Sequence, residues 1–377
     1  MASCQDVSLA KSGCPKFDGQ IGMVGADIWI SFLLAGVLLF STPWTAGASA
    51  NPAQMSSQHT ADSTVIVGDD WSPFNESQLT PLLPWEIVWL LEEAQDRLRN
   101  RSHLPLALEM ARTMARYTSV VYCKDENIMA WNCSRCNERA AAFSTFSTIE
   151  DAAWDLKAYT GWSPSLPGIV VAFRGTDSHS VGNWVENMRY WRTDFKVPYP
   201  GADGSKVHTG FFSSYNFSNL QPNVSTAVGA MLEQHPGADV YIMGHSMGAA
   251  VATICAIDVK FTFDLPRERV HLYTFGSPRV GNDVFARFVS TQIRDSIRVT
   301  HNRDIVPAWP PMWVGFHHLP TEIWVIDIGF AHVVGVCDDT GEDPMCHNSV
   351  CFLGFCTSIA DHLLYMGEIM GRGYPEC

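Results

Sequence analysis

The fold of this chain is decided by residues 239–257, Asp-Val-Tyr-Ile-Met-Gly-His-Ser-Met-Gly-Ala-Ala-Val-Ala-Thr-Ile-Cys-Ala-Ile. The first five residues are typical of a buried strand, and residues 248–257, which are small or apolar, are typical of a helix. Between them lies a G-x-S-x-G motif centred on Ser246, a sharp turn whose glycines let strand and helix pass close together. Such a turn exposes the serine hydroxyl at the end of the sheet. We therefore predict that Ser246 is a catalytic nucleophile; the alternative is a chance match on an ordinary turn.

Two residues are candidates for stabilising an oxyanion beside Ser246. The N–H of Met247 lies at the N-terminus of the predicted helix, where unpaired donors and the helix dipole favour negative charge. A second donor is expected in a loop that follows an earlier strand. Thr176 ends the segment Phe-Arg-Gly-Thr at 173–176 and offers both its N–H and its hydroxyl. The alternative is a strand-ending turn in which Thr176 caps a helix.

The acid and the base are sought after the serine, because the architecture that uses this turn places serine, acid and histidine in that order. Asp304 follows a predicted strand and lies in the loop Asn-Arg-Asp-Ile-Val-Pro at 302–307, so it is the candidate acid. His362 is the leading candidate for the base because it lies near the C-terminus of the chain. The other residues that qualify by order are four aspartates, which we interpret as surface carboxylates, and four histidines: Asp258, Asp264, Asp283, Asp295, His317, His318, His332 and His347.

A short apolar stripe follows the Thr176 loop. Its residues recur at spacings of three and four, which predicts one face of a helix. Two tryptophans on a helix beside the oxyanion loop favour a lid that covers the serine and opens onto an apolar phase. The alternative is a plain core-facing helix. The stripe consists of Val181, Trp184, Val185, Met188 and Trp191.

Charge and composition restrict the partners. The 377 residues have a formal net charge of −14, which argues against nucleic acid and against charge-driven docking on anionic lipid. Any contact with lipid is therefore expected to be apolar. The hydrophobic content of 46% is ample for a large core.

The first 84 residues are expected to lie outside the folded domain. Residues 28–40 form an apolar run that leads into the small-x-small pattern Ala48-Ser49-Ala50, which predicts that residues 1–50 are a secretory signal. An uncleaved membrane anchor through residues 28–44 is the alternative. Residues 51–84 are polar and aperiodic, as in a linker or pro-segment. The remainder, 85–377, is the predicted domain.

The cysteines and glycosylation sequons indicate an oxidising compartment. Of the eleven cysteines, Cys4 and Cys14 belong to the leader, and Cys255 falls in the apolar helix as a buried free thiol. The other eight predict four disulfides. A Cys-x-x-Cys pair could instead be a redox or half-zinc motif, but no second pair accompanies it, so we expect no metal and no cofactor. The eight cysteines are Cys123, Cys133, Cys136, Cys337, Cys346, Cys351, Cys356 and Cys377, and the sequons begin at Asn75, Asn100, Asn132, Asn216 and Asn223.

The rest of the pattern predicts one α/β domain with a largely parallel central sheet. Helices are predicted at 85–94 and 105–121. Buried strands are predicted at 169–173, 240–243, 270–275, 297–300 and 323–326.

Over residues 105–377 the chain resembles the class 3 lipases of the filamentous-fungal triacylglycerol lipase type. The resemblance rests on several segments in matching order, besides the Ser246 turn: Tyr122-Cys123, Trp131 to Cys136, Phe173 to Thr176, Asn183-Trp184, Val207 to Phe211, Gly276 to Asn282, Asn302 to Pro307, Asp361-His362 with Tyr365, and Cys377. Met247 stands where leucine is usual, and residues 177–182 are longer than the usual lid hinge.

The resemblance implies an α/β-hydrolase fold with a helical lid near residues 181–191. It implies that Ser246, Asp304 and His362 form the triad and that Thr176 and Met247 form the oxyanion hole. The disulfides that it implies are Cys123 to Cys377, Cys133 to Cys136 and Cys337 to Cys346, which leaves Cys351 and Cys356 to pair.

The expected function is that of a secreted serine ester hydrolase, a triacylglycerol lipase acting through an acyl-enzyme at a lipid–water interface. The alternatives are a phospholipase A1, a feruloyl or other carboxylesterase and, more remotely, a non-catalytic binding module on the same fold. The expected partner is a lipid ester at an oil or micelle surface, with no nucleic acid and no stable protein partner.

Overall fold

The computed structural model describes residues 104–176, 180–183, 192–194, 199–327, 332–351, 356–371 and 377. The predicted signal or anchor at 1–50, the linker at 51–84 and the helix at 85–94 lie outside these residues. In the described part of the chain, no helix is long and apolar enough to cross a membrane.

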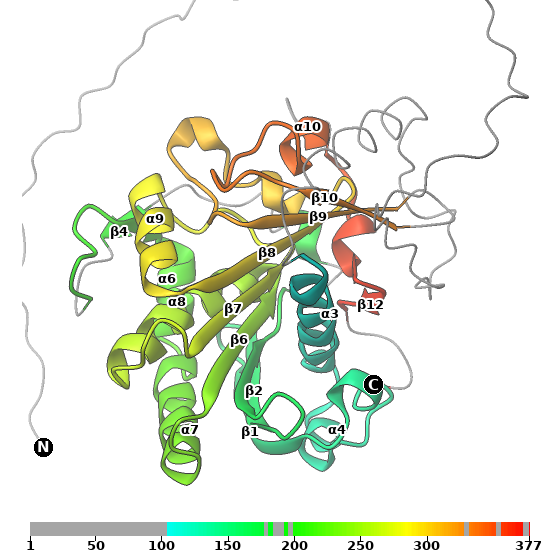
Figure 1. The fold of residues 1–377 in the computed structure, drawn as a ribbon, viewed down its shortest axis with the longest axis vertical. Coiled ribbons are helices and arrows are strands. Elements are labelled where there is room, and N and C mark those ends of the chain that lie inside the picture. Colours follow the sequence, from blue (N-terminus) through cyan, green and yellow to red (C-terminus); the bar gives the residue numbers. More distant parts are fainter. Residues whose placement is uncertain are drawn as a thin grey trace, which may run out of the picture. The chain divides into compact units, whose positions relative to one another are not determined.

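An eight-stranded sheet forms the centre of the domain, in the order β1-β2-β3-β6-β7-β8-β9-β10 (Figure 1). Strands β3, β6, β7, β8 and β9 pair in parallel, whereas β1, β2 and β10 are added antiparallel at the two sides. The sheet is thus largely parallel, as predicted. The bounds are β1 (Ser144–Asp151), β2 (Leu156–Ser163), β3 (Gly168–Phe173), β6 (Asp239–His245), β7 (Val270–Phe275), β8 (Asp295–His301), β9 (Glu322–Asp327) and β10 (His332–Val336).

All five predicted strands are present as β3, β6, β7, β8 and β9. Their apolar runs are buried on both faces because helices cover the parallel sheet from two sides. Along β3, for example, Ile169, Val171 and Phe173 join one core cluster, while Val170 and Ala172 join the other. Strands β1, β2 and β10 were not predicted; β1 and β2 interleave polar residues with apolar ones, and β10 is a short run of His332 followed by Val-Val-Gly-Val.

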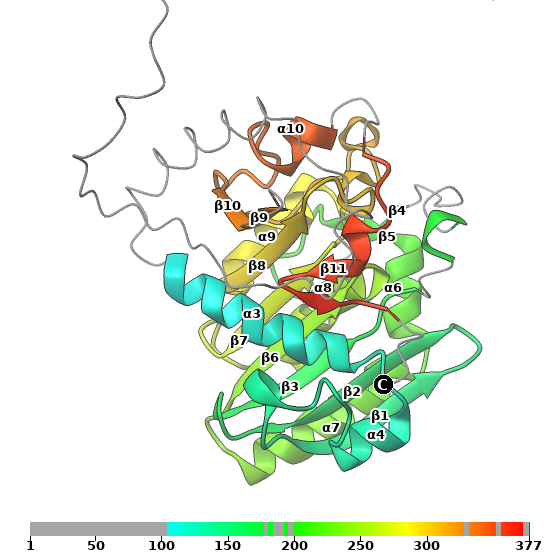
Figure 2. The same cartoon turned by 90° about the vertical axis from the view of Figure 1, so that its right-hand side faces the viewer.

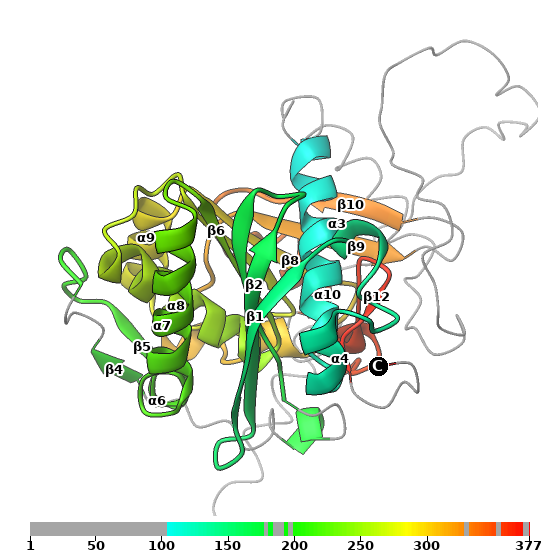
Figure 3. The same ribbon diagram turned by 90° about the horizontal axis from the view of Figure 1, so that it is seen from below.

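Helices lie on both faces of the sheet. Figure 3 shows α6 to α9 on one side of the strands and α3 on the other, and Figure 2 shows α3 running across its face. The predicted helix at 105–121 is α3. The helices are α3 (Leu104–Val120), α4 (Asp125–Ala130), α6 (Thr209–Asn216), α7 (Leu220–Gln234), α8 (Met247–Thr262), α9 (Asp283–Gln292) and α10 (His347–Cys351).

Short elements complete the described part of the chain. Two of them are paired strands: β4 (Arg192–Asp194) with β5 (Lys206–His208), and β11 (Leu364–Tyr365) with β12 (Glu368–Ile369). The single-turn 3₁₀ helices are η3 (Glu138–Ala140), η5 (Val306–Ala308), η6 (Met312–Val314) and η8 (Asp361–Leu363).

Helix α8 is buried nearly all round, and this makes one sequence interpretation wrong. Asp258, interpreted as a surface carboxylate, is buried. Its carboxylate accepts hydrogen bonds from the hydroxyls of Tyr199 (3.1 Å) and Tyr215 (2.8 Å) and from the Gln221 amide (3.2 Å). These donors come from other elements, which is how the fold compensates a charge taken out of water.

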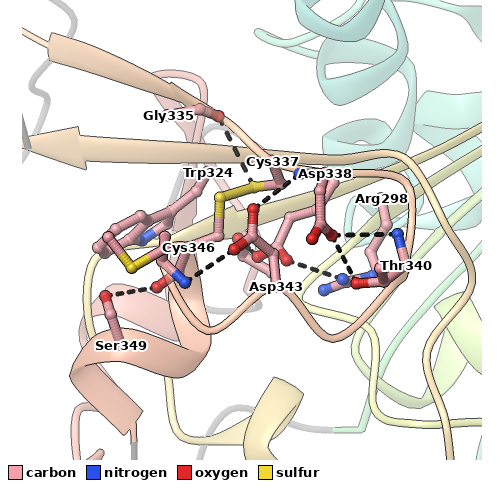
Figure 4. The surroundings of a disulfide bond; sticks show 12 residues. Arg298, Trp324, Gly335, Cys337, Asp338, Thr340, Asp343, Cys346 and Ser349 are labelled. Atoms are coloured by element: carbon pink, nitrogen blue, oxygen red, sulfur yellow. Dashed lines mark hydrogen bonds and ion pairs between the residues drawn. A yellow bond between two sulfur atoms is a disulfide. The ribbon is translucent and has the colours of Figure 1, made fainter. Parts of the chain in front are cut away.

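Four disulfides join the cysteines in the pairs that the resemblance implied, including the additional one. They are Cys123–Cys377, Cys133–Cys136, Cys337–Cys346 and Cys351–Cys356, and Cys255 is a buried free thiol. Figure 4 shows the surroundings of Cys337–Cys346, where the Asp343 carboxylate accepts from the N–H groups of Asp338 (2.7 Å) and Met345 (2.8 Å).

Candidate active site

Ser246 occupies the turn between β6 and α8. Its backbone has φ 57° and ψ −130°, a conformation that L-residues rarely adopt, and its N–H donates to the Phe275 carbonyl on β7 at 2.9 Å. The side chain is fully buried, so the expectation of an exposed hydroxyl is wrong for this structure. Gly175 approaches this side chain closely: a Cβ there would lie 2.7 Å from the Ser246 Cβ.

Two glycines let backbone segments come together at this site. A Cβ on Gly248 would lie 2.4 Å from the Arg174 carbonyl oxygen, so only glycine lets α8 start this close to the loop after β3. Gly276, at φ 56°, follows β7. A Cβ there would lie 2.8 Å from Asp304 Oδ2 and 2.9 Å from His362 Cε1.

Asp304 and His362 form a buried pair. The His362 Nδ1–H donates to Asp304 Oδ2 at 2.8 Å. The Tyr365 hydroxyl donates to the same oxygen, and the Val306 N–H donates to Oδ1 at 2.8 Å. Burial alone would raise the pKa of Asp304, but the charge of His362 and these three hydrogen bonds outweigh it and lower the pKa. The carboxylate is therefore ionised and fixes the ring's tautomer.

One side-chain atom of Ser246 and one of His362 are buried without a hydrogen-bond partner. Within the described residues, neither Ser246 Oγ nor His362 Nε2 has a hydrogen bond. Both residues adjoin the end of β7, because the Ser246 N–H donates to the Phe275 carbonyl and the His362 ring lies against Gly276. A buried polar atom left unpaired costs about 1–3 kcal/mol, so such atoms are retained where function uses them.

Tyr122 and His245 connect the loop at Gly175, the end of β6 and the loop at His362. Neither residue was given a role from the sequence. The Gly175 N–H donates to the Tyr122 oxygen at 3.0 Å, and the Tyr122 hydroxyl donates to His245 Nδ1 at 2.6 Å. The His245 Nε2–H then donates to the His362 carbonyl at 2.8 Å. Burial, and the nearby charge of His362, hold the pKa of His245 well below its usual value, so the ring is neutral.

The predicted oxyanion residues lie beside each other. Thr176 directly follows Gly175, and its hydroxyl is 3.8 Å from the Met247 sulfur. Met247 is the first residue of α8, so its N–H is one of those that the helix leaves without a partner. The structure thus brings Thr176, in the loop after β3, against Met247, the residue that follows Ser246.

Only one residue of the predicted lid stripe is described. Val181 is buried and packs with Val306, next to Ile305 and Trp309. Residues 181–183 are helical. The other members, Trp184, Val185, Met188 and Trp191, lie outside the described residues.

Comparison with known proteins places this geometry in a family. Residues 170–313 match the family model described as lipase (class 3). A solved structure of a triacylglycerol lipase, whose catalytic centre is formed by a serine protease triad, superposes with a TM-score of 0.61 at 30% identity, over 70% of this chain and 95% of that one. The chain belongs to the class 3 lipase family.

Two relatives match over part of their length. A lipase of Rhizomucor miehei is 35% identical over 240 residues, covering 63% of this chain and 62% of the relative. A secreted mono- and diacylglycerol lipase of Fusarium solani is 37% identical over 171 residues, covering 45% of this chain and 47% of the relative. The chain thus spans less than two thirds of the length of either relative.

The other acidic and histidine candidates of this class 3 lipase chain lie elsewhere. Asp283 pairs with Arg287, and Asp295 with His271. Of the four alternative histidines, His318 binds the Pro307 carbonyl and His332 binds Asp327. Among the described residues, two groups bring possible metal ligands together: His347 with Cys351 and Cys356, and Glu322 with Cys337 and Cys346. Their sulfurs are in disulfides and are not thiolate ligands.

His301 is a further buried histidine that the sequence analysis did not single out. Its Nδ1 lies 2.9 Å from the Asp361 carbonyl oxygen and its Nε2 lies 2.8 Å from Asp327 Oδ2. Both neighbours are acceptors, so both ring nitrogens donate and the ring is a cation. Because Asp361 precedes His362 and His301 lies three residues before Asp304, this cation links the two loops that supply the acid and the base.

The His301 cation predicts an alkaline loss of stability. Burial alone would lower the pKa of His301, but the charge of Asp327 and the hydrogen bonds to Asp327 and Asp361 outweigh it and raise the pKa to about 9. The folded-state pKa thus lies above the pKa of His301 in the unfolded chain. The stabilisation by the protonated ring is therefore complete below about pH 6.5 and is lost as the pH rises through about 9. We expect the free energy of unfolding to fall by on the order of 3 kcal/mol over this range.

Denaturant titrations at intervals of pH test this prediction. His301→Gln keeps a donor but cannot titrate, so its stability should be lower and should lack this alkaline fall. His317→Gln, at a partly buried histidine that binds a carbonyl, serves as the control and should keep the wild-type slope. An unchanged slope in His301→Gln would assign the effect to another group.

Proposed function

We propose that the protein is a secreted serine ester hydrolase, a triacylglycerol lipase that acts at lipid–water interfaces. The observation that supports this most is the buried Asp304–His362 pair beside the Ser246 elbow, with Ser246 Oγ and His362 Nε2 both unpartnered. A structural serine and histidine would normally be hydrogen-bonded when buried this deeply.

In the proposed reaction, His362 Nε2 takes the proton of Ser246 while Ser246 Oγ attacks the ester carbonyl carbon. Asp304 holds the ring with Nδ1 protonated and stabilises the imidazolium that forms. His362 then gives the proton to the departing alkoxide, which leaves an acyl group on Ser246. A water molecule repeats the sequence on the acyl-enzyme and releases the carboxylic acid.

The oxyanion of each tetrahedral intermediate would be held by the N–H groups of Thr176 and Met247. Both lie where a helix start and a strand-ending loop meet at Ser246, and fixed donors of this kind stabilise charge without reorganising. The chain of hydrogen bonds from Gly175 through Tyr122 to His245 would keep these two backbone segments in register with His362.

We further propose that residues 181–191 form a lid over the site. The described ends of this segment support the proposal, since Val181 packs on the loop after Asp304 and Arg192 donates to the Gly315 carbonyl of the same loop. An apolar lid has a use when the substrate is an oil, and the named activities of the relatives are on acylglycerols. Secretion is supported by the predicted leader at 1–50, the four disulfides and the name of the Fusarium relative.

A hydrolysis panel tests this function. Emulsified triolein, phosphatidylcholine vesicles, dissolved p-nitrophenyl butyrate and methyl ferulate are compared, with fluorophosphonate labelling of Ser246 as the check for a reactive serine. We expect labelling, the highest turnover on triolein, and a sharp rise in rate when a glyceride passes its solubility limit. Preference for phosphatidylcholine or methyl ferulate would replace the lipase proposal by a phospholipase or a feruloyl esterase, and absence of labelling would indicate a binding module.

A further inference from the structure

The loop that follows Asp304 exposes two neighbouring apolar side chains on the turn η6. Trp313 is 83% exposed and Met312 is 49% exposed. Single exposed apolar residues are ordinary, but a tryptophan of this exposure beside a methionine forms a small continuous apolar projection. No mechanism step described above uses either side chain.

The backbone that presents these side chains is firmly held. The Arg279 guanidinium, itself buried, donates through Nη1 to the carbonyls of Ala308 at 2.9 Å and Pro310 at 3.2 Å, and the Arg279 N–H donates to the Trp309 carbonyl at 2.9 Å. On the other side, the Gly315 N–H closes the turn onto the Met312 carbonyl at 2.7 Å. A side chain on a fixed turn loses little backbone entropy when it is bound.

The position of the turn relates it to the active site. The loop starts at Asp304, beyond the carboxyl end of β8, and its carbonyl at Gly315 accepts from Arg192 on β4. Val181 packs against Ile305, Val306 and Trp309 at the start of the same loop. Both described flanks of residues 184–191 therefore contact the segment that bears Trp313.

The segment that carries Met312 and Trp313 has no charged residue of its own, which bears on the kind of surface it can bind. Residues 305–316, Ile-Val-Pro-Ala-Trp-Pro-Pro-Met-Trp-Val-Gly-Phe, include no Asp, Glu, Lys or Arg, although the chain as a whole has a net charge of −14. Arg192, a cation that contacts the turn, binds the Gly315 carbonyl and lies over the Phe316 ring, so the exposed side chains themselves offer no charge to a basic protein or an anionic membrane. Tryptophan, with an apolar body and one N–H donor, favours the boundary between lipid and water.

We propose that Trp313 and Met312 insert into the surface of neutral lipid and dock the enzyme there, independently of residues 184–191. This inference rests on the proposed function, since it names how the same site reaches an aggregated substrate. The turn would fix the orientation of the domain with the Ser246, Asp304 and His362 loops toward the lipid.

Adsorption to triolein emulsion tests the proposal, measured by flotation in a Ser246→Ala background so that no lipid is consumed. Trp313→Ser should lower the partition coefficient by about tenfold, the loss expected for one large apolar side chain, and Met312→Ser with Trp313→Ser should lower it further. Trp313→Phe should restore most of the binding. In the active enzyme, turnover of dissolved p-nitrophenyl butyrate should stay within about twofold of wild type.

Phe146→Ser is the matched control. Phe146 is 42% exposed and lies in the bulge at the start of β1, near the opposite ends of the strands. The Phe146→Ser variant should adsorb to triolein as the parent does. The docking proposal would be overturned if Trp313→Ser adsorbed as well as the parent, or if Phe146→Ser lost as much adsorption as Trp313→Ser. It would also be overturned if binding depended on Trp313 only with anionic vesicles. If the wild type adsorbs to triolein but does not hydrolyse it, the proposed function fails instead.

Discussion

Replacing Ser246 by alanine is expected to lower kcat for p-nitrophenyl butyrate by at least ~10⁴-fold while leaving the fold intact. The substitution removes the nucleophile itself, so what remains is the contribution of the oxyanion donors and of binding. The Ser246 hydroxyl has no hydrogen bond in the described structure, so its loss breaks none. The free energy of unfolding from denaturant titration should therefore be equal to that of the wild type or slightly higher, and fluorophosphonate labelling should vanish.

Ser205 offers a close control. It is likewise buried, and its Oγ also has no partner among the described residues, but it lies before β5 and outside the elbow. Ser205→Ala should keep wild-type turnover and labelling. If both variants lose activity equally, an unpartnered buried serine is not specific to the mechanism, and the assignment of Ser246 would have to be withdrawn.

Asp304→Asn is expected to lower kcat by about 10⁴-fold. An amide at this position has no charge to stabilise the imidazolium, and its NH₂ group can turn toward His362 Nδ1 and favour the wrong tautomer. The Tyr365 hydroxyl and the Val306 N–H already donate to the carboxylate, so the amide cannot satisfy all three donors. Tyr365→Phe should have a smaller effect, because it removes one donor and leaves the charge in place.

The controls for this prediction are other aspartates of the same part of the chain. Asp283, which is exposed and pairs with Arg287, and Asp295, which binds His271, should tolerate replacement by asparagine with less than about a tenfold change in kcat. Steady-state kinetics and far-ultraviolet circular dichroism on the three variants separate loss of catalysis from loss of fold. A near-normal Asp304→Asn beside an inactive Asp295→Asn would show that the acid is misassigned.

The parallel part of the fold was predictable because its signal is local. Each of β3, β6, β7, β8 and β9 is a run of apolar residues buried on both faces, and such a run is visible in one window of sequence. Strand β1 alternates exposed and partly buried residues with a bulge, and β2 includes Lys157, Thr160 and Ser163, which are buried through pairing with their neighbours. These side chains are buried because of partners elsewhere in the chain, so no local sequence pattern predicts their burial.

The site was predictable as far as chain order and strand ends determine it. The elbow marked Ser246, and Asp304 and His362 followed from their order and position; the structure brings the last two within 2.8 Å. The supporting contacts were not predictable from these patterns. Tyr122 meets His245 across 123 residues, and His301 meets Asp361 across 60, so only the folded chain reveals them.

The glycines at 248 and 276 have a consequence for how this enzyme can be altered. Gly248 lies against the carbonyls of Phe173 and Arg174, and Gly276 lies against the side chains of Asp304 and His362, so main-chain atoms at both positions set how closely the parts of the proposed site approach one another. Selection for a new substrate cannot change that approach by single replacements there, since any side chain would displace Asp304 or the start of α8. Diversity in a mutant library is better placed at Met312 and Trp313 of the uncharged loop, where the side chains are exposed and the backbone is held by Arg279.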